Sequence, residues 1–381
     1  MEWKEYSLGD ISKLKYGKNV SAKLCKGPVP IFSGYRKIGT CNTINCKKNT
    51  VIVIARGAGG CGDVKLTKED CFLTNLSISV ELDKGICNAK WFYYNHLLNN
   101  LSFLNSGSAQ PQITIDSLSK YLIRIPPIII QRKIAGILSA LDAKIENNNK
   151  INANLETQAE ALFKSWFVDF TPFKDQPFVD SELGPIPQGW KVGKLGDIGE
   201  IVGGSTPSKS KPEYYTTHGI AWLTPKDLST SKAKFTSRGE IDITDEGYNS
   251  TSTKLMPRGS VLFSSRAPIG YLTIAKNEIC TNQGFKSLVP NGAGTGFIYY
   301  TLRHLTPQIE NRATGSTFKE ASATLMRSVE TIVPPTSILN KFEELLRPIL
   351  QFQEKKEEEN QRLAALRDTL LPKLMSVEIK L

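Results

Sequence analysis

The feature that most constrains this sequence is an internal repeat. The segments that begin at Trp3 and Trp190 share the pattern Trp-Lys-x-x-x-Leu-Gly-Asp-Ile. Further matching pairs are Arg56 with Arg266, Thr74 with Thr281, and Gly107 with Gly315. The offset between matching residues grows from 187 to 208, so the second copy holds about 21 extra residues, inserted before Arg266. Because internal repeats fold as similar units, the sequence predicts two related lobes.

Each copy is followed by a long helical pattern, expected over residues 129–170 and 336–381. Apolar residues recur there at steps of three and four, which places them along one seam of a helix. The seam residues are Leu141, Ile145, Asn152, Leu155, Leu162, Ile349, Asn360, Leu363 and Leu370. A buried Asn fixes the register of a helix pair. We therefore expect the two helices to pack as an antiparallel coiled coil about an approximate two-fold axis.

Prolines predict where the long helices are interrupted or end. Pro348 lacks a backbone N–H, so it is expected to kink the second helix and leave residues 349–371 as its continuous part. Residues 171–189 form a proline-rich, non-periodic connector. This connector is expected to be a linker or an extended strap over the surface.

The two lobes, residues 1–128 and 190–335, contain short runs rich in β-branched residues, separated by Gly, Asn and Pro. A helix-like segment follows these runs in each lobe, near residues 90–99 and 296–306. The sequence therefore predicts an α+β fold in which each lobe is built on a twisted or barrel-like sheet with helices.

The net charge is concentrated in the lobes. The whole chain carries +11, of which residues 1–128 carry +8 and residues 183–335 carry +5, whereas residues 129–182 carry −2 and residues 336–381 carry 0. Such a balance suggests a polyanionic partner, and a membrane-binding helix would show the opposite distribution. The N-terminus lacks the apolar run of a signal peptide, and no stretch is long enough to span a bilayer, so we expect a cytoplasmic protein.

The cysteines and histidines give little support for a metal site. There are seven Cys and three His, and no pair of cysteines has the Cys-x-x-Cys spacing. Reduced, buried thiols are the expected state.

Sequence motifs of catalysis or cofactor binding are also weak. Residues 57–62 match Gly-x-Gly-x-x-Gly, but residues 63–67 alternate like a strand and do not open a helix, so a tight glycine turn is the better interpretation. We find no Walker loop, no clustered carboxylates of a nuclease, and no Asn/Asp-Pro-Pro-aromatic motif of an adenine methyltransferase. The sequence indicates a binding protein without catalytic residues.

Polar loops that carry cations and amides are the candidate nucleic-acid contacts. Arg, Lys, Asn and Gln can bind base edges, whereas Ser, Thr and Lys suit phosphates. The candidates in the first lobe are Lys18, Asn19, Arg36, Lys37, Arg56, Ser108 and Gln110. Those in the second lobe are Lys209, Lys211, Lys226, Arg266, Asn282, Gln283, Ser316 and Thr317.

The chain resembles the specificity (S) subunits of Type I restriction-modification systems over its whole length. The motifs that carry the resemblance are the shared opening of each lobe, Gly203-Gly204-Ser205-Thr206-Pro207, Trp222-Leu223-Thr224-Pro225-Lys226-Asp227-Leu228, Thr281-Asn282-Gln283-Gly284 and Ser165-Trp166-Phe167-Val168-Asp169-Phe170. The resemblance implies that each lobe is a target recognition domain for one half of a bipartite site in double-stranded DNA. It also implies that the helices set the spacing and dock two methyltransferase subunits.

The same resemblance implies that this chain itself binds no cofactor. S-adenosylmethionine, and ATP with Mg, are expected on the methyltransferase and the restriction or translocase subunits. The first lobe departs from the family pattern, because it has Tyr16-Gly17-Lys18-Asn19-Val20 where the second has Gly203-Gly204-Ser205-Thr206-Pro207. We interpret this difference as two different half-sites.

Three alternatives remain open from the sequence. The chain could be a free-standing nuclease or methyltransferase, against which the missing motifs argue. It could be the DNA-binding subunit of another methyltransferase or nuclease with a bipartite site. It could also be a non-enzymatic coiled-coil adaptor, for which DNA affinity would be absent or insensitive to salt.

Overall fold

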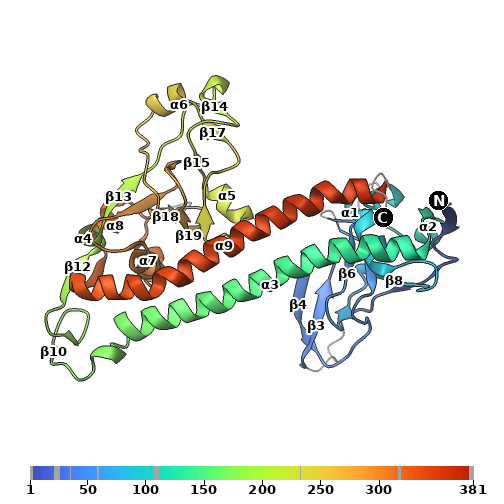
Figure 1. Cartoon of the computed structure of the whole chain (residues 1–381), viewed down its shortest axis with the longest axis horizontal. Helices are drawn as coiled ribbons and strands as arrows, with labels where there is room; N and C mark the ends of the chain where they lie inside the picture. The colour runs from blue at the N-terminus through green and yellow to red at the C-terminus, as the bar shows by residue number, and fades with distance from the viewer. Residues whose placement is uncertain are drawn as a thin grey trace. The chain divides into compact units, whose positions relative to one another are not determined.

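The computed structural model describes residues 3–20, 26–34, 36–57, 60–106, 111–231, 233–315 and 319–376. These residues divide into two compact units, one formed by Met1–Glu146 with Asn360–Leu381 and the other by Asn147–Glu359. Two 40-residue helices, α3 (Ile128–Phe167) and α9 (Thr336–Met375), contribute to both units (Figure 1). Each unit therefore contains one lobe and one half of each long helix.

The first lobe is a mixture of short strands and helices. Its elements are β1 (Lys4–Ser7), β2 (Ser12–Tyr16), β3 (Val29–Ser33), β4 (Arg36–Cys41), β5 (Val51–Ile54), β6 (Val64–Leu66), β7 (Phe72–Leu73), β8 (Ser77–Leu82), α1 (Ala89–Leu98), η1 (Ser102–Leu104), α2 (Ile115–Ser119) and β9 (Leu122–Ile125). The strands form sheets in the orders β2-β8-β5-β6, β4-β3-β7 and β1-β9.

The second lobe is also a mixture of short strands and helices, and it contains more of them than the first lobe. They are β12 (Lys191–Lys194), α4 (Leu195–Ile198), β13 (Gly199–Gly203), η3 (Pro212–Tyr214), β14 (Tyr215–Thr216), β15 (Trp222–Leu223), α5 (Pro225–Thr230), β16 (Phe235–Thr236), β17 (Asp242–Ile243), α6 (Asp245–Asn249), β18 (Val261–Ser265), β19 (Ile269–Ala275), β20 (Cys280–Thr281), β21 (Lys286–Pro290), α7 (Thr295–Arg312), α8 (Ala323–Ser328) and β22 (Glu330–Val333). The main sheet has the order β13-β21-β18-β19-β16, and the pairs β12-β22, β14-β17 and β15-β20 lie beside it. The α+β class predicted from the sequence is confirmed.

The strand pairing reproduces the sequence repeat. In the first lobe β1 pairs with β9 so that Lys4 lies opposite Ile125, and in the second β12 pairs with β22 so that Lys191 lies opposite Val333. Both pairs are antiparallel, and they bring the start and the end of each lobe together just before a long helix begins. Two isolated bridges are likewise equivalent, Arg56 with Gln112 and Arg266 with Glu320.

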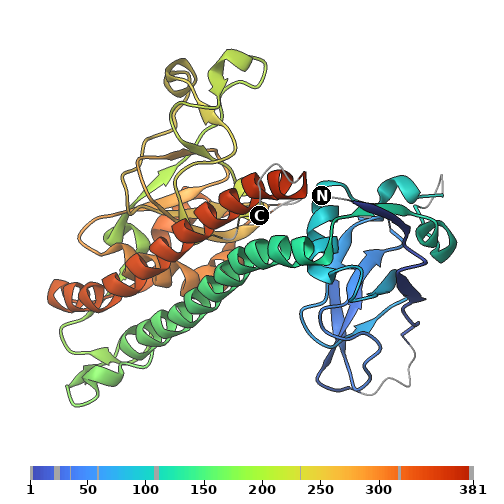
Figure 2. The same ribbon diagram turned by 45° about the vertical axis from the view of Figure 1, so that its right-hand side comes forward.

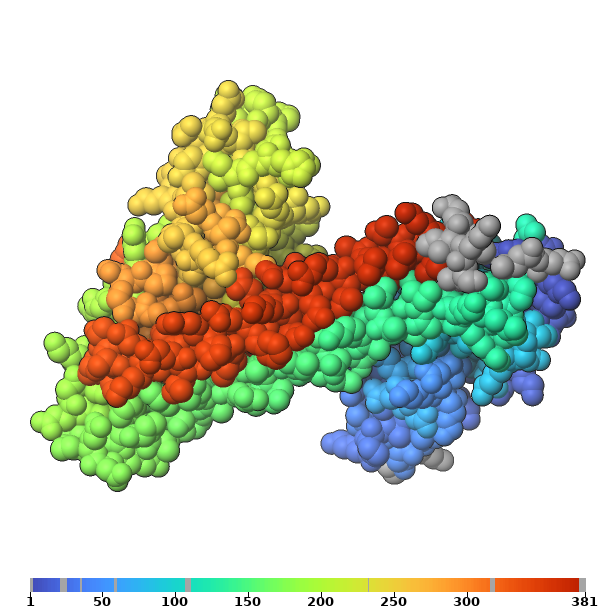
Figure 3. Space-filling view, viewed as in Figure 1, coloured from blue at the N-terminus to red at the C-terminus, as the bar shows by residue number. Residues whose placement is uncertain are grey.

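One end of the second lobe lies away from the long helices of its unit. The segment with α6, β14 and β17, coloured yellow-green to yellow, forms the end of the lobe away from α9 (Figures 2 and 3).

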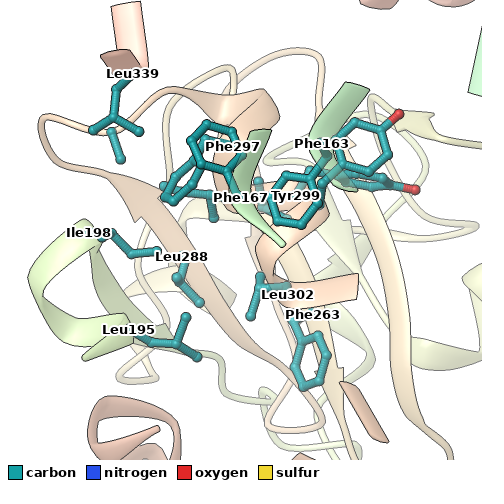
Figure 4. Close-up of a cluster of buried hydrophobic side chains, with 14 of the residues drawn as sticks. Phe163, Phe167, Leu195, Ile198, Phe263, Leu288, Phe297, Tyr299, Leu302 and Leu339 are labelled. Atoms are coloured by element: carbon teal, nitrogen blue, oxygen red, sulfur yellow. The ribbon is translucent and has the colours of Figure 1, made fainter. Parts of the chain in front are cut away.

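Both long helices supply part of each lobe's core. Figure 4 shows Phe163 and Phe167 of α3 packed with Phe297 of α7, among buried residues of the second lobe. The ring centroids of Phe167 and Phe297 are 4.8 Å apart. In the first unit Ile134 of α3 and Leu374 of α9 are buried in the core of the first lobe. Apolar residues of the two long helices therefore pack into the cores of the lobes as well as against the other long helix.

The helix pair has a polar centre, which the structure describes within the second unit. Asn148 is fully buried and donates from Nδ2 to Glu359 Oε2 at 3.0 Å. Asn152 donates to the carbonyl of Gln353 at 3.3 Å, and Gln353 Nε2 donates back to the carbonyl of Asn152 at 3.2 Å. Since a later residue of α3 meets an earlier residue of α9, the helices are antiparallel, as predicted.

The predicted seam residues are all partly buried. They are Leu141, Ile145, Asn152, Leu155, Leu162, Ile349, Asn360, Leu363 and Leu370. Within the second unit, Asn148, Ala159, Phe163 and Phe167 of α3 are more completely buried. Phe163 packs on Phe297 and Tyr300 of α7 and on Phe342 of α9, so α3 is buried there against both helices.

In each lobe a tyrosine from a Tyr-Tyr pair donates a hydrogen bond to the long helix α3. Tyr299-Tyr300 of α7 corresponds to Tyr93-Tyr94 of α1 at an offset of 206. In the first unit Tyr94 donates its hydroxyl to Asp142 at 2.6 Å, and Arg367 also binds Asp142, at 2.8 Å. A tyrosine, a carboxylate and a cation from three helices meet there.

The second unit has a larger version of this contact, which we call the Lys234 cluster: Lys234, Glu156, Tyr300, Arg303, Gln353 and Glu357. Lys234 is 8% exposed, and its ammonium donates to Glu156, to Tyr300 at 2.6 Å and to Gln353 at 3.0 Å. Its backbone N–H donates to Glu357 at 2.9 Å. The strand region before β16, α7 and both long helices are therefore joined by one buried polar network.

The predicted continuous range of the second long helix, 349–371, is too short. Helix α9 continues from Thr336 to Met375 through both Pro348 and Pro372. Pro348 removes one hydrogen bond to Glu344, but both residues are exposed, so the unpaired carbonyl faces solvent. Leu346 and Leu350 are buried on the opposite side and hold the helix across the gap.

The connector is folded onto the second unit. It contains η2 (Thr171–Phe173) and an antiparallel pair of β10 (Phe178–Val179) with β11 (Ile186–Pro187). Phe173 and Ile186 are buried in the core of this unit. The strap alternative therefore describes the connector better than a free linker.

The cysteine prediction is confirmed where the structure describes these residues. Cys41, Cys46, Cys61, Cys71, Cys87 and Cys280 are buried and free, and Cys25 lies outside the described residues. Within the described ranges no group of His, Cys, Asp or Glu could hold a metal ion. None of the described helices is both long and apolar enough to cross a bilayer.

The Lys234 cluster yields a stability prediction. Replacing Glu156 by Gln leaves the Lys234 ammonium buried without its counter-charge, so the free energy of unfolding of the second unit should fall by about 3 kcal/mol. The control is Glu160→Gln one turn later, because the pair of Glu160 with Arg303 is more exposed and should cost no more than about 1 kcal/mol. Urea unfolding followed by fluorescence measures both, and equal losses would contradict the role of burial.

The same carboxylate predicts an acid-dependent loss of stability. Burial favours the neutral acid, but Lys234, Gln353 and Arg303 outweigh it and hold the pKa of Glu156 below its ordinary value of 4.5. Its contribution is therefore present above the ordinary carboxyl pKa and is lost as the pH falls through the lowered folded-state pKa. In Glu156→Gln this part of the acid dependence of unfolding should be absent.

Candidate DNA-recognition surface

A cleft of about 610 Å³ opens on the second lobe where several strands end. Its walls include five residues predicted from the sequence, Lys209, Lys226, Arg266, Asn282 and Gln283. These residues follow the carboxyl ends of β13, β15, β18 and β20. Strands β13 and β18 are both antiparallel to β21, and β15 is parallel to β20, so each pair delivers its loops in a common direction.

Two aromatic residues fix the floor of this cleft. Trp222 is buried and donates its indole N–H to the carbonyl of Ser205 at 3.1 Å. Tyr215 donates its hydroxyl to the carbonyl of Pro207 at 2.6 Å, and the two rings meet edge to face. The loop after β13 is thereby held against the cleft by side chains from outside it.

Acidic residues balance some of the cations. Lys226 binds Glu240 at 3.2 Å, and Arg266 binds Glu320 at 3.3 Å. The side chains of Lys226 and Glu240 are both largely exposed, and an exposed ion pair contributes little to stability. Lys226 can therefore leave Glu240 and bind a phosphate with little loss of free energy. Asp227 has a structural role, because it accepts from the backbone N–H and hydroxyl of Thr224 at 2.7 Å each.

One predicted residue of the second lobe that the structure describes is not brought to the cleft. Lys211 does not line it, and donates to the hydroxyl of Tyr214 at 2.9 Å. Ser316 and Thr317 lie outside the described residues.

The first lobe places Lys18, Asn19 and Arg56 at the corresponding edge. Lys18 and Asn19 follow β2, and Arg56 follows β5; these strands both run antiparallel to β8. The guanidinium of Arg56 lies 5.9 Å from the ring centre of Tyr16. Arg36 and Lys37 begin β4, after the turn that follows β3. Ser108 and Gln110 lie outside the described residues.

The sequence reasoning missed the residues that shape the cleft. Thr206, Tyr215, Trp222 and Glu240 line it but were not candidates. Trp222 and Thr206 belong to motifs of the family pattern, which was the one available signal for them. Tyr215 and Glu240 lie in the early part of the lobe, where the two copies have diverged most and the repeat gives no guidance.

Comparisons with known proteins agree with this architecture. The family described as Type I restriction modification DNA specificity domain matches residues 1–157 and 187–363, so each match contains one lobe. The MjaIX specificity subunit of Methanocaldococcus jannaschii is 38% identical over 179 residues, which is 44% of this chain and 41% of that relative. The HindI specificity subunit of Haemophilus influenzae is 26% identical over 470 residues, covering 99% of this chain and 100% of the relative.

A solved structure shares the fold. The S subunit of a Type I restriction-modification system from M. genitalium superposes with a TM-score of 0.69 at 19% identity, over 98% of this chain and 96% of the other. The matched family covers both lobes and most of both long helices. The chain therefore belongs to the Type I restriction modification DNA specificity domain family.

Proposed function

We propose that this chain is the non-catalytic DNA-recognition subunit of a Type I restriction-modification complex, in which each lobe reads one half of a bipartite DNA site. The observation that carries the proposal is the cleft of the second lobe, where cationic and amide side chains from four strand ends converge. The relatives named above are specificity subunits of type I restriction enzymes.

The chemistry of the cleft suits a duplex. Lys209 and Lys226 can bind phosphate oxygens, whereas Asn282 and Gln283 carry amides that can pair with base edges. The lobes carry the positive charge of the chain, +8 for residues 1–128 and +5 for residues 183–335. Long-range attraction would therefore bring DNA to the lobes and not to the helices.

In this proposal the helices set the distance between the half-sites and dock two methyltransferase subunits. Leu345, Phe352 and Leu366 of α9 are exposed apolar residues that could take part in docking. S-adenosylmethionine belongs on the methyltransferase subunits, and ATP with Mg on restriction or translocase subunits. The assembly would act on DNA in the cytoplasm.

Exchanging one lobe tests the proposal directly. Residues 183–335 are replaced by the corresponding segment of another specificity subunit with a known site, and the modified DNA is mapped for methylation. We expect one half of the site to change and the other half, with the gap, to remain. A change in both halves would contradict the assignment of one half-site to each lobe.

Removing a lysine from the cleft tests its contact with phosphate. Lys226→Met should weaken DNA binding for all sequences and reduce the slope of log affinity against log salt by about 1, because one phosphate contact is lost. Lys191→Met in β12 is the matched control and should leave the slope unchanged. A binding constant insensitive to salt in the unmodified protein would instead favour an adaptor that binds proteins only.

Shortening the helices tests their role as a spacer. Deleting one heptad from each of α3 and α9 shortens the pair by roughly 10 Å, so the unread gap should lose about three base pairs. Replacing the same heptads by others with the same apolar positions is the control and should keep the gap. An unchanged gap after the deletion would show that the helices do not set the spacing.

A further inference from the structure

The turn after β20 presents a glutamine into the cleft from a fixed backbone. Asn282 accepts from the N–H of Gly284 through its own Oδ1 at 2.8 Å, so its side chain closes the turn. A Cβ at Gly204 would overlap the carbonyl oxygens of Thr281 and Asn282, which shows how closely the neighbouring loop packs on this turn. Gln283 is the exposed residue of the turn.

The amide of Gln283 is oriented by a threonine. The hydroxyl of Thr206 donates to Gln283 Oε1 across the cleft. Thr206 is itself held between Ser205, whose N–H donates to the Thr281 carbonyl at 3.0 Å, and Pro207, whose carbonyl accepts from Tyr215. An exposed glutamine usually samples many rotamers, but here one face of its amide is already bound, which leaves Nε2 and the second lone pair of Oε1 for a ligand.

The first lobe has the same scaffold with different side chains. Gly17 corresponds to Gly204, and a Cβ at Gly17 would likewise overlap carbonyl oxygens of Leu73 and Thr74. At the repeat offsets Leu76 stands in place of Gln283 and Asn19 in place of Thr206. A leucine cannot make paired hydrogen bonds, so the two lobes differ in recognition chemistry at an equivalent position.

We propose that Gln283 is a specificity-determining residue of the second lobe that reads an adenine, and that Thr206 is the positioning residue that orients its amide. A carboxamide presents a donor and an acceptor side by side, which matches the N7 acceptor and N6 donor of adenine in the major groove. Of the cations that could compete for guanine, Arg266 is paired with Glu320, and Lys226 is assigned above to a phosphate. The inference rests on the proposed function and adds the base that one residue selects.

The test uses the complex reconstituted with its methyltransferase subunits and a panel of duplexes in which every base pair of both half-sites is substituted singly. In the unmodified protein one A·T pair of the half-site read by the second lobe should be preferred by about 5- to 150-fold. Gln283→Leu, which installs the residue of the first lobe, should abolish this preference and leave all other positions unchanged. Gln308→Leu is the matched control, because it removes an exposed amide from α7 and should change no position.

Two further variants separate reading from support of the fold. Gln283→Glu keeps the size but removes the donor, so the preference at the same position should move from adenine to cytosine, whose N4 group donates to a carboxylate. Thr206→Val should keep adenine as the preferred base with a smaller ratio, and Thr206→Ser should restore the ratio.

The outcomes distinguish the inference from the proposed function. If the unmodified protein recognises a bipartite site but Gln283→Leu and Gln283→Glu keep its preference at every position, or alter several positions at once, the role of Gln283 is wrong while the proposed function stands. If the unmodified protein shows no preference in either half-site, the proposed function itself fails.

Discussion

The charge of Lys234 inside the second unit is the interaction on which this part of the structure depends. A buried ammonium without partners would cost several kcal/mol, so Glu156, Gln353 and Tyr300 must approach it together. These residues come from α3, α9 and α7, so the network ties the lobe to both long helices. Apolar packing alone, such as that of Phe163 and its neighbours, would allow more freedom.

The two lobes share a duplicated backbone scaffold and differ in the side chains that it carries. The strand pairs β1-β9 and β12-β22 and the tyrosine pairs on α1 and α7 are equivalent, whereas the side chains at the strand ends are not. A protein that recognises two different half-sites requires this combination of a repeated scaffold and different loops. Glycine at positions 17 and 204 belongs to the scaffold, because any larger residue would displace the turn beside it.

Much of the fold could be predicted because its main features leave patterns that can be read directly from the sequence. The repeat and the apolar periodicity indicated two α+β lobes and an antiparallel helix pair. Pro348 was misjudged because its helical turn is held by buried neighbours, which periodicity alone does not reveal. In the site, Lys226, Arg266 and Gln283 could be named from residue type, whereas Tyr215 and Glu240 lie where the two copies have diverged most and reach the cleft only through the tertiary fold. Lys234 was not singled out from the sequence, because its burial follows only from the tertiary fold.

The central claim is that one chain reads two separate DNA segments with two unlike lobes. The most direct measurement is to map every methylated adenine in DNA modified by the complex reconstituted from this chain and its methyltransferase subunits. We predict a single bipartite motif, with two different specified segments separated by a gap of fixed length in which all bases occur. A continuous motif, or two identical halves, would contradict the account.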